Sequence, residues 1–217
     1  LGALPLYYQP GTMWDYGLGL DVLGLVVEAI ARQSLGRHLE ERLFKPLGMI
    51  DTGFVVPSAK ASRSAKPLPT DPLTGQRQSI ADRTKTPPME CGGACGVSTA
   101  ADYLRFAQML LNKGTLDGSR ILGRKTVEVM TADQLGPEVN IDRLRQYPNL
   151  NGYGFGLSVA VRRDYGVAGI MGSPGDFNWG GANGTYFWVD PKEELAVVFM
   201  AAAPGGIRVR YRQIITT

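Results

Sequence analysis

Residues 184–190 and 194–202, GTYFWVD and ELAVVFMAA, decide the fold class of this 217-residue chain. Both segments are rich in β-branched and aromatic residues, and the sequence DPKEE at 190–194 joins them. This pattern predicts two consecutive strands connected by a turn. GYGFGLSVAVRR at 152–163 and GVAGIMGS at 166–173 have a similar strand-like composition. We therefore expect four antiparallel strands after residue 147, followed by an amphipathic closing helix at 207–217.

Upstream of residue 147 the apolar residues follow a helical period instead. They predict helices at about 21–34, at about 36–44, between Thr99 and Gly114, and at 125–136. Thr99 and Asp102 have the spacing of a capping box, and Gly114 is the expected C-terminal cap. LDGSRIL at 116–122 predicts a tight hairpin. The first helix places Val22, Leu23, Val26, Val27 and Ile30 on one face, and the helix after Thr99 is expected to bury Tyr103, Leu104, Phe106, Ala107, Leu110 and Leu111.

Together these patterns predict an α+β fold, in which an antiparallel sheet with flanking helices follows a helical region. Residues 1–146 form the mainly helical region, and residues 147–217 form the strands and the closing helix. Residues 58–88 are rich in Ser, Lys, Pro and Thr, and they predict a long irregular excursion. Long loops of this kind are usually functional or mobile.

The composition excludes several classes of function. Hydrophobic residues make up 44% of the chain and charged residues 20%, as in ordinary globular proteins, and no apolar run approaches the ~20 residues of a membrane span. The net charge of +3 arises from mixed charges. The short arginine cluster at 208–212 indicates a solvated helix face, so no nucleic-acid partner is expected.

Metal and cofactor chemistry also lack support in the sequence. The chain contains one histidine and two cysteines, too few of the usual ligands for a zinc site, so neither a metal nor a cofactor is expected. Cys91 and Cys95 lie in MECGGACG, where they could form a small disulfide or remain two free thiols. The spacing leaves both possibilities open.

Two familiar catalytic arrangements are absent. His38 lies on the polar side of a short helix and is expected to be a surface residue, and no G-x-S-x-G elbow occurs, which excludes a Ser-His-Asp hydrolase of that type. The glycine-rich CGGACG lacks the Lys-Ser/Thr of a P-loop. GYGFGL follows no strand-to-helix transition, so it is not expected to bind a dinucleotide.

Five stretches remain, in the order YYQPGTMWDYGLGLDVLGLVVE (7–28), LFKPLGMIDTGF (43–54), GGACGVSTAADYLRFAQMLLNKGTLDG (92–118), GYGFGL (152–157) and WGGANGTYFWVDP (179–191). This ordered set resembles the later portion of a serine β-lactamase-like hydrolase, of the class C β-lactamase and penicillin-binding-protein fold, on the family VIII carboxylesterase branch. The resemblance implies a β-lactamase/transpeptidase-like fold whose N-terminal part is missing here.

The resemblance also implies roles for individual residues. Tyr16 matches the tyrosine that relays a proton in the family, with Gly17 and Leu18 in the next two places. Trp179, Gly180 and Gly181 match a motif that lies on a strand at the edge of the substrate cleft, and the backbone N–H of Ala182 would bind the developing oxyanion. Removing one such donor typically costs about 3–4 kcal/mol.

Structural interpretations of the same residues are simpler. Tyr16 could be a packed aromatic residue at a helix start, and Trp179 could belong to the core. The family's nucleophile is the serine of Ser-x-x-Lys, and this chain contains no such motif. We expect the serine and the lysine upstream of Leu1, and we expect the fragment alone to be inactive.

The two matched motifs favour a neutral ester as substrate. Trp179 replaces the lysine with which β-lactamases bind a carboxylate, and Leu18 replaces an amide donor. The expected function is ester cleavage through an acyl-enzyme, with Phe177, Asp15 and the 58–88 excursion shaping the pocket. The alternatives are a β-lactamase or D-alanyl peptidase, an acyltransferase, and a non-catalytic protein of the penicillin-recognising type. The natural ester, the oligomeric state and the compartment stay open.

Overall fold

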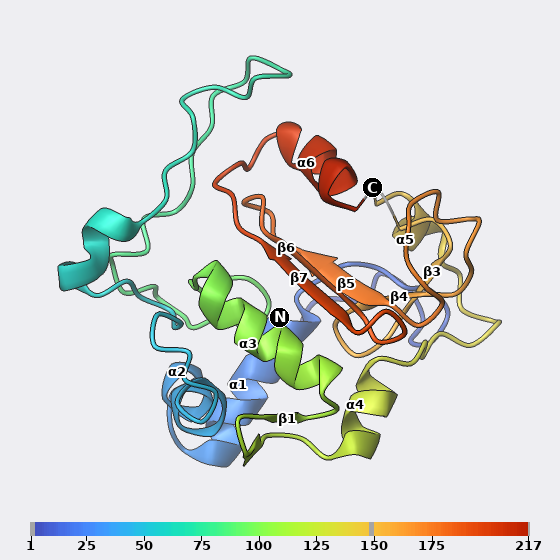
Figure 1. Ribbon diagram of the computed structural model, residues 1–217, viewed down its shortest axis with the longest axis horizontal. Helices are drawn as coiled ribbons and strands as arrows, with labels where there is room; N and C mark the ends of the chain where they lie inside the picture. The colour runs from blue at the N-terminus through green and yellow to red at the C-terminus, as the bar shows by residue number, and fades with distance from the viewer. Residues whose placement is uncertain (1–2, 148–149, 217) are drawn as a thin grey trace.

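The sheet at the centre of the molecule is a five-stranded antiparallel meander in the order β3-β4-β5-β6-β7 (Figure 1). A computed structural model describes residues 3–147 and 150–216. The strands are β3 (Tyr153–Phe155), β4 (Ala160–Arg162), β5 (Phe177–Gly180), β6 (Tyr186–Asp190) and β7 (Leu195–Phe199). The structure therefore confirms the α+β fold class, with two of the strands at the positions that their composition predicts.

Side-chain alternation along β6 sends neighbouring residues to opposite faces of the sheet, where different helices cover them. Phe187 contacts Tyr103 of α3 (Ala100–Leu111), with ring centroids 5.3 Å apart. On the other face, the Arg212 guanidinium of α6 (Ile207–Ile215) lies over the ring of Tyr186, 5.7 Å from the ring centroid. The face of α3 carries the main core, which includes the buried residues Leu47, Met49, Ala107, Met109, Leu110, Val127, Val159, Val161, Phe177, Phe187 and Val189.

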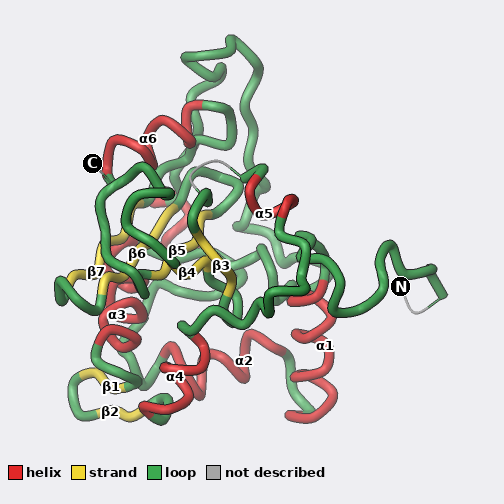
Figure 2. The backbone as a smooth tube through the Cα atoms, turned by 90° about the vertical axis from the view of Figure 1, so that its right-hand side faces the viewer, coloured by secondary structure: helices red, strands yellow, loops and turns green. Residues whose placement is uncertain are grey.

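The remaining elements surround this sandwich (Figures 1 and 2). They are α1 (Gly19–Ala31), α2 (Leu35–Leu39) with a π-helical turn at Glu40–Phe44, a 3-10 helix at Ser58–Arg63, β1 (Thr115–Leu116), β2 (Ser119–Arg120), α4 (Arg124–Met130) and α5 (Asp142–Arg145). The predicted hairpin is confirmed, because Asp117 and Gly118 join β1 to β2 with positive φ angles. None of the helices in the described part of the chain is long and apolar enough to cross a membrane.

The apolar face predicted for the first helix is not buried in this chain. Val22, Leu23, Val26 and Ile30 are all exposed, and Gly24 is the buried residue of α1. A Cβ atom at Gly24 would lie 3.3 Å from the backbone nitrogen of Gly92. The helix thus packs through Gly24 against the 91–95 loop, and of its predicted stripe only the half-buried Val27 packs against the cluster of Leu35, Phe54 and Cys95.

One predicted strand is two shorter strands in the structure, and another predicted strand does not form. Residues 152–163 form the hairpin of β3 and β4, because Ser158 turns the chain with a φ of 74°. Residues 166–173 form no strand. The buried guanidinium of Arg162 donates to the carbonyls of Ile170 (3.1 Å) and Met171 (2.8 Å), which holds this segment as a loop. The same guanidinium forms a 2.6 Å ion pair with Asp176, at the start of β5.

Only half of the predicted capping box at α3 forms. The Thr99 hydroxyl accepts a hydrogen bond from the Asp102 N–H, as a cap should. The Asp102 carboxylate instead accepts from the Asp51 N–H (2.7 Å) and the Thr52 hydroxyl (2.9 Å). It therefore ties α3 to the segment after α2. Leu104, expected in the buried stripe, is 40% exposed.

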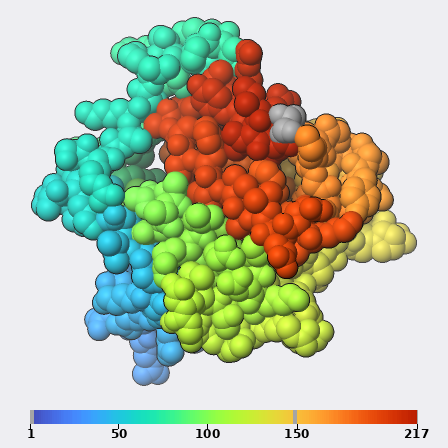
Figure 3. Space-filling view, in the orientation of Figure 1, coloured from blue at the N-terminus to red at the C-terminus, as the bar shows by residue number. Residues whose placement is uncertain are grey.

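The 58–88 excursion is irregular apart from its 3-10 helix, and its tip lies beside α6 (Figures 2 and 3). Asp71, buried near the tip, accepts from the backbone N–H of Ile207 at the start of α6 (3.1 Å). It also accepts from the N–H groups of Leu73 and Thr74 within its own turn. These backbone bonds hold the pKa of Asp71 below its ordinary value. The Asp71 carboxylate, together with the Gln78 side chain that accepts from the Gly205 N–H (3.0 Å), therefore connects the excursion to the start of the closing helix.

The sequence leaves open whether the two cysteines are bonded or free. In the structure they form the disulfide Cys91–Cys95, with Cα atoms 5.3 Å apart. The loop that it closes contacts the first turn of α1, where the Gly93 N–H donates to the Asp21 carboxylate (3.0 Å).

We expect Asp102→Ala to destabilise the full-length protein by about 2–4 kcal/mol, because two donors then lose a charged acceptor. The change should be measured as the free energy of unfolding in urea. The matched variant Thr99→Ala removes only the helix cap and should cost about 1 kcal/mol. Equal losses for the two variants would show that the Asp102 carboxylate does not tie the two segments together.

Candidate active site

Tyr16 and Trp179, which lie at opposite ends of the sequence, stack against each other in the structure. Their ring centroids are 5.9 Å apart and their planes are 19° from parallel. Tyr147 contacts both rings, at 5.9 Å from Tyr16 and 6.4 Å from Trp179. Tyr16 remains 51% exposed, so the stack lies at the surface of the described chain.

The segment that carries Tyr16 is anchored two residues earlier, at Trp14. The indole of Trp14 is buried and contacts Phe155, with centroids 4.9 Å apart. The Trp14 N–H donates to the carbonyl of Asn140 (2.9 Å), so the backbone is held as well. Because residues two apart in an extended segment share a side, the burial of Trp14 directs Tyr16 toward Trp179.

Strand β5 places its motif residues on two faces. Trp179 pairs with Phe187 and packs against the core, whereas Gly180 pairs with Tyr186 on the face covered by α6. A Cβ atom at Gly180 would collide with the Arg212 guanidinium, and one at Gly181 would collide with the Thr185 hydroxyl. A larger residue at either position would therefore displace a neighbouring side chain, which the motif match did not predict.

The turn after β5 is held by two arginines of α6. Arg212 donates to the carbonyls of Gly181 (2.6 Å) and Thr185 (3.1 Å), and Arg208 donates to the carbonyl of Ala182 (3.0 Å). The arginine cluster at 208–212 was expected to form a solvated helix face, but of its three arginines only Arg210 is exposed. Their i, i+4 spacing was the available signal, because it puts both side chains on one side of the helix.

The other predicted residues differ in their surroundings. Ala182 is exposed in the turn, and within the described chain its amide N–H has no hydrogen-bond acceptor. Leu18 is 57% exposed and directly precedes α1. Phe177 is 1% exposed and packs in the main core, so its side chain does not reach the surface where Tyr16 lies. The structure thus brings Tyr16 to the strand that leads into the Ala182 turn, and it places Phe177 elsewhere.

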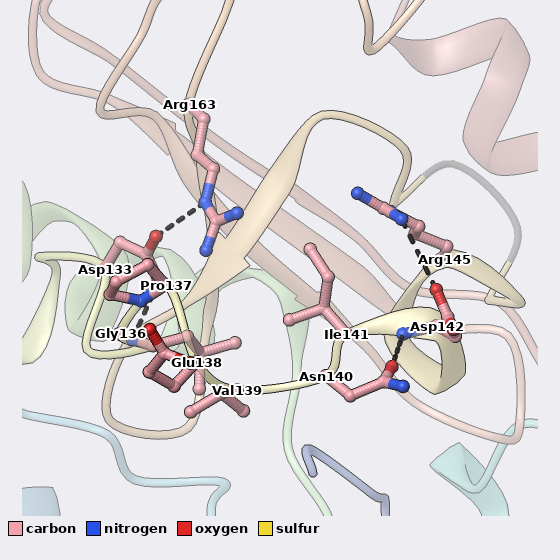
Figure 4. A pocket seen from close by; sticks show the side chains of 11 residues that line it. Asp133, Gly136, Pro137, Glu138, Val139, Asn140, Ile141, Asp142, Arg145 and Arg163 are labelled. Carbon is pink, nitrogen blue, oxygen red and sulfur yellow. Dashed lines mark hydrogen bonds and ion pairs between the residues drawn. The ribbon is translucent and has the colours of Figure 1, made fainter. Parts of the chain in front are cut away.

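A separate pocket of about 610 Å³ lies along the 133–142 loop and contains none of the predicted site residues (Figure 4). Four of its five charged side chains form ion pairs, Arg163 with Asp133 (2.6 Å) and Arg145 with Asp142 (3.4 Å), and the fifth is Glu138. Among residues 3–147 and 150–216, no cluster of three His, Cys, Asp or Glu side chains could hold a metal ion.

The chain belongs to the beta-lactamase family, whose model matches residues 1–214. Protein Rv1367c of Mycobacterium tuberculosis is 37% identical over 205 residues, which cover 92% of this chain and 51% of the relative. Esterase EstB of Burkholderia gladioli is 30% identical over 224 residues, which cover 92% of this chain and 52% of the esterase. The chain therefore spans about half the length of these curated relatives.

The structural comparison agrees with this assignment. The solved structure of EstCE1, described as a hydrolase with promiscuous acyltransferase activity, superposes with a TM-score of 0.82 at 26% identity. The match covers 98% of this chain and 57% of EstCE1. The fold is therefore that of the serine β-lactamases and transpeptidases, in a family that contains hydrolases, esterases and acyltransferases.

We expect Gly180→Ala to reduce any turnover supported by this site at least about tenfold, because the new Cβ displaces Arg212 from the turn. The measurement is kcat/KM of the full-length protein. The matched control is Gly166→Ala, where a Cβ meets no atom within 4 Å. Equal activity of the two variants would mean that the packing around Gly180 has no influence on the site.

Proposed function

We propose that the complete protein is a serine hydrolase that cleaves carboxylic esters through an acyl-enzyme. The observation that carries this proposal is that Tyr16 stacks on Trp179. In the chain, Trp179 directly precedes Gly180, Gly181 and Ala182. Tyr16 and Ala182 are both exposed in the described chain, so a phenol oxygen and an unpaired backbone donor are open to a substrate.

In the proposed reaction a serine hydroxyl attacks the ester carbonyl while Tyr16, as the phenolate, takes its proton. The new C–O bond places negative charge on the former carbonyl oxygen, which the Ala182 N–H stabilises. Collapse of this intermediate breaks the bond to the alcohol, and Tyr16 returns the proton to the departing oxygen. Water then repeats the sequence on the acyl-enzyme and releases the acid.

The serine itself is not among these 217 residues, because no Ser-x-x-Lys occurs in the sequence. We propose that it belongs to the part of the full-length protein that precedes residue 1. This proposal fits the extent of the matches, in which the chain covers 51% and 52% of its relatives. The lysine of the same motif would supply the positive charge that a tyrosine needs to lose its proton near neutral pH.

An ester suits the site better than a β-lactam. Trp179 offers one N–H donor but no positive charge to pair with a carboxylate, and Leu18 has no donor for an amide carbonyl, unlike the β-lactamase residues at these positions. Both favour an apolar acyl or alcohol group. Acyl transfer to an alcohol is the second candidate, since EstCE1 is described as having this side activity; it uses the same acyl-enzyme, and product analysis with an added alcohol distinguishes it.

We expect the full-length protein to hydrolyse short-chain p-nitrophenyl esters and the 217-residue chain alone to be inactive. Tyr16→Phe in the full-length protein should lower kcat by about 10²–10⁴-fold, because the proton relay is lost. The matched control is Tyr165→Phe, which removes an exposed hydroxyl that contacts Lys192 instead.

Full activity of Tyr16→Phe would remove Tyr16 from the mechanism. Turnover of nitrocefin comparable to ester turnover would contradict the ester assignment while leaving the acyl-enzyme in place. Failure of a fluorophosphonate to label the full-length protein would favour the non-catalytic alternative.

A further inference from the structure

Arg212 of α6 contacts the peptide unit that matters most for the proposed reaction. The carbonyl of Gly181 and the N–H of Ala182 belong to the same peptide group, so a bond to one end acts on the other. Arg212 donates to that carbonyl at 2.6 Å, which is short for a charge-assisted hydrogen bond. Gly184 donates to the same carbonyl oxygen at 3.1 Å.

The guanidinium is held firmly at this position. It lies over the ring of Tyr186 at 5.7 Å, it also bonds the Thr185 carbonyl, and Gly180 leaves the space that it fills. Burial and the nearby charge of Arg208 lower the pKa of Arg212 from its ordinary value. No acidic partner of Arg212 occurs among the ion pairs of the described residues. Its charge is therefore directed at backbone carbonyls.

We propose that Arg212 is a positioning residue that orients and polarises the 181–182 peptide so that the Ala182 N–H binds the oxyanion. This proposal rests on the proposed function. A cation at the carbonyl end of a peptide draws electron density from its nitrogen, which strengthens the N–H as a donor. A fixed donor also needs no reorganisation when the charge develops.

Arg208 provides an internal comparison. It bonds the Ala182 carbonyl, which belongs to the next peptide unit, whose N–H is that of Asn183. Loss of Arg208 can therefore loosen the turn without removing the charge from the 181–182 peptide. Arg210 lies on the same helix, is exposed and serves as the control for a change of charge alone.

The test compares Arg212→Met, Arg208→Met and Arg210→Met in the full-length protein, with a p-nitrophenyl ester and its thionoester analogue. Sulfur accepts hydrogen bonds poorly, so the ratio of kcat/KM for the two substrates reports the oxyanion donors. For Arg212→Met we expect kcat to fall about 10–100-fold with KM within threefold, and the oxoester preference to fall about tenfold. Arg208→Met and Arg210→Met should keep the wild-type preference.

An equal loss for both substrates in Arg212→Met would indicate a purely structural role and would overturn the inference, as would full activity. If Arg212→Met does not fold, Arg212→Gln decides, because it removes the charge and keeps a polar side chain: a preference at least threefold below wild type supports the inference, and an unchanged preference contradicts it. Absence of ester turnover in the wild-type protein would contradict the proposed function and the inference together.

Discussion

The alternation of side chains along β5 is the constraint on which the candidate site depends. Trp179 faces the core and Tyr16, whereas Gly180 faces α6 and Arg212. One strand therefore joins the aromatic stack to the arginine-held turn. A shift of the register by one residue would exchange these faces, which would bury a glycine against Tyr16 and drive an indole into the guanidinium.

The closing helix holds the turn, and the long excursion holds the closing helix. Asp71 bonds the first turn of α6, and Arg208 and Arg212 of the same helix bond the carbonyls after β5. The excursion, which is far from the turn in the sequence, is thus connected to it through α6. One set of hydrogen bonds joins the excursion to α6, and a second set joins α6 to the turn. This arrangement gives the 58–88 excursion a mechanical role, beside the pocket-shaping role that its composition suggested.

The sequence predicted those parts of the fold in which one periodicity dominates. The β6–β7 pair follows from the β-branched and aromatic composition of the two segments, and the β1–β2 hairpin follows from Asp117 and Gly118. The misassigned 166–173 segment has strand-like composition, but the buried guanidinium of Arg162 binds its carbonyls, and no local pattern reveals such a long-range bond. The exposed stripe of α1 shows that periodicity identifies an apolar face without identifying what covers it.

The candidate site could be predicted only where a motif marks its residues, and not where it depends on long-range contacts. Tyr16 and Trp179 were found through motifs, and the structure brings their rings together. Phe177 was expected to shape the pocket, yet its side chain packs in the main core. Arg212 was missed because an arginine on a short amphipathic helix resembles an ordinary solvated residue, and only the three-dimensional arrangement shows that it contacts Gly181.

The central claim is that the Ala182 amide is aimed at the oxygen on which negative charge develops. A crystal structure of the full-length protein after inactivation by a p-nitrophenyl phosphonate tests it directly, because the phosphoryl oxygen occupies the position of the oxyanion. The account predicts a distance of about 2.7–3.1 Å from that oxygen to the Ala182 nitrogen. An adduct whose phosphoryl oxygen points away from Ala182, or an Ala182 amide bonded to another protein group, would contradict it.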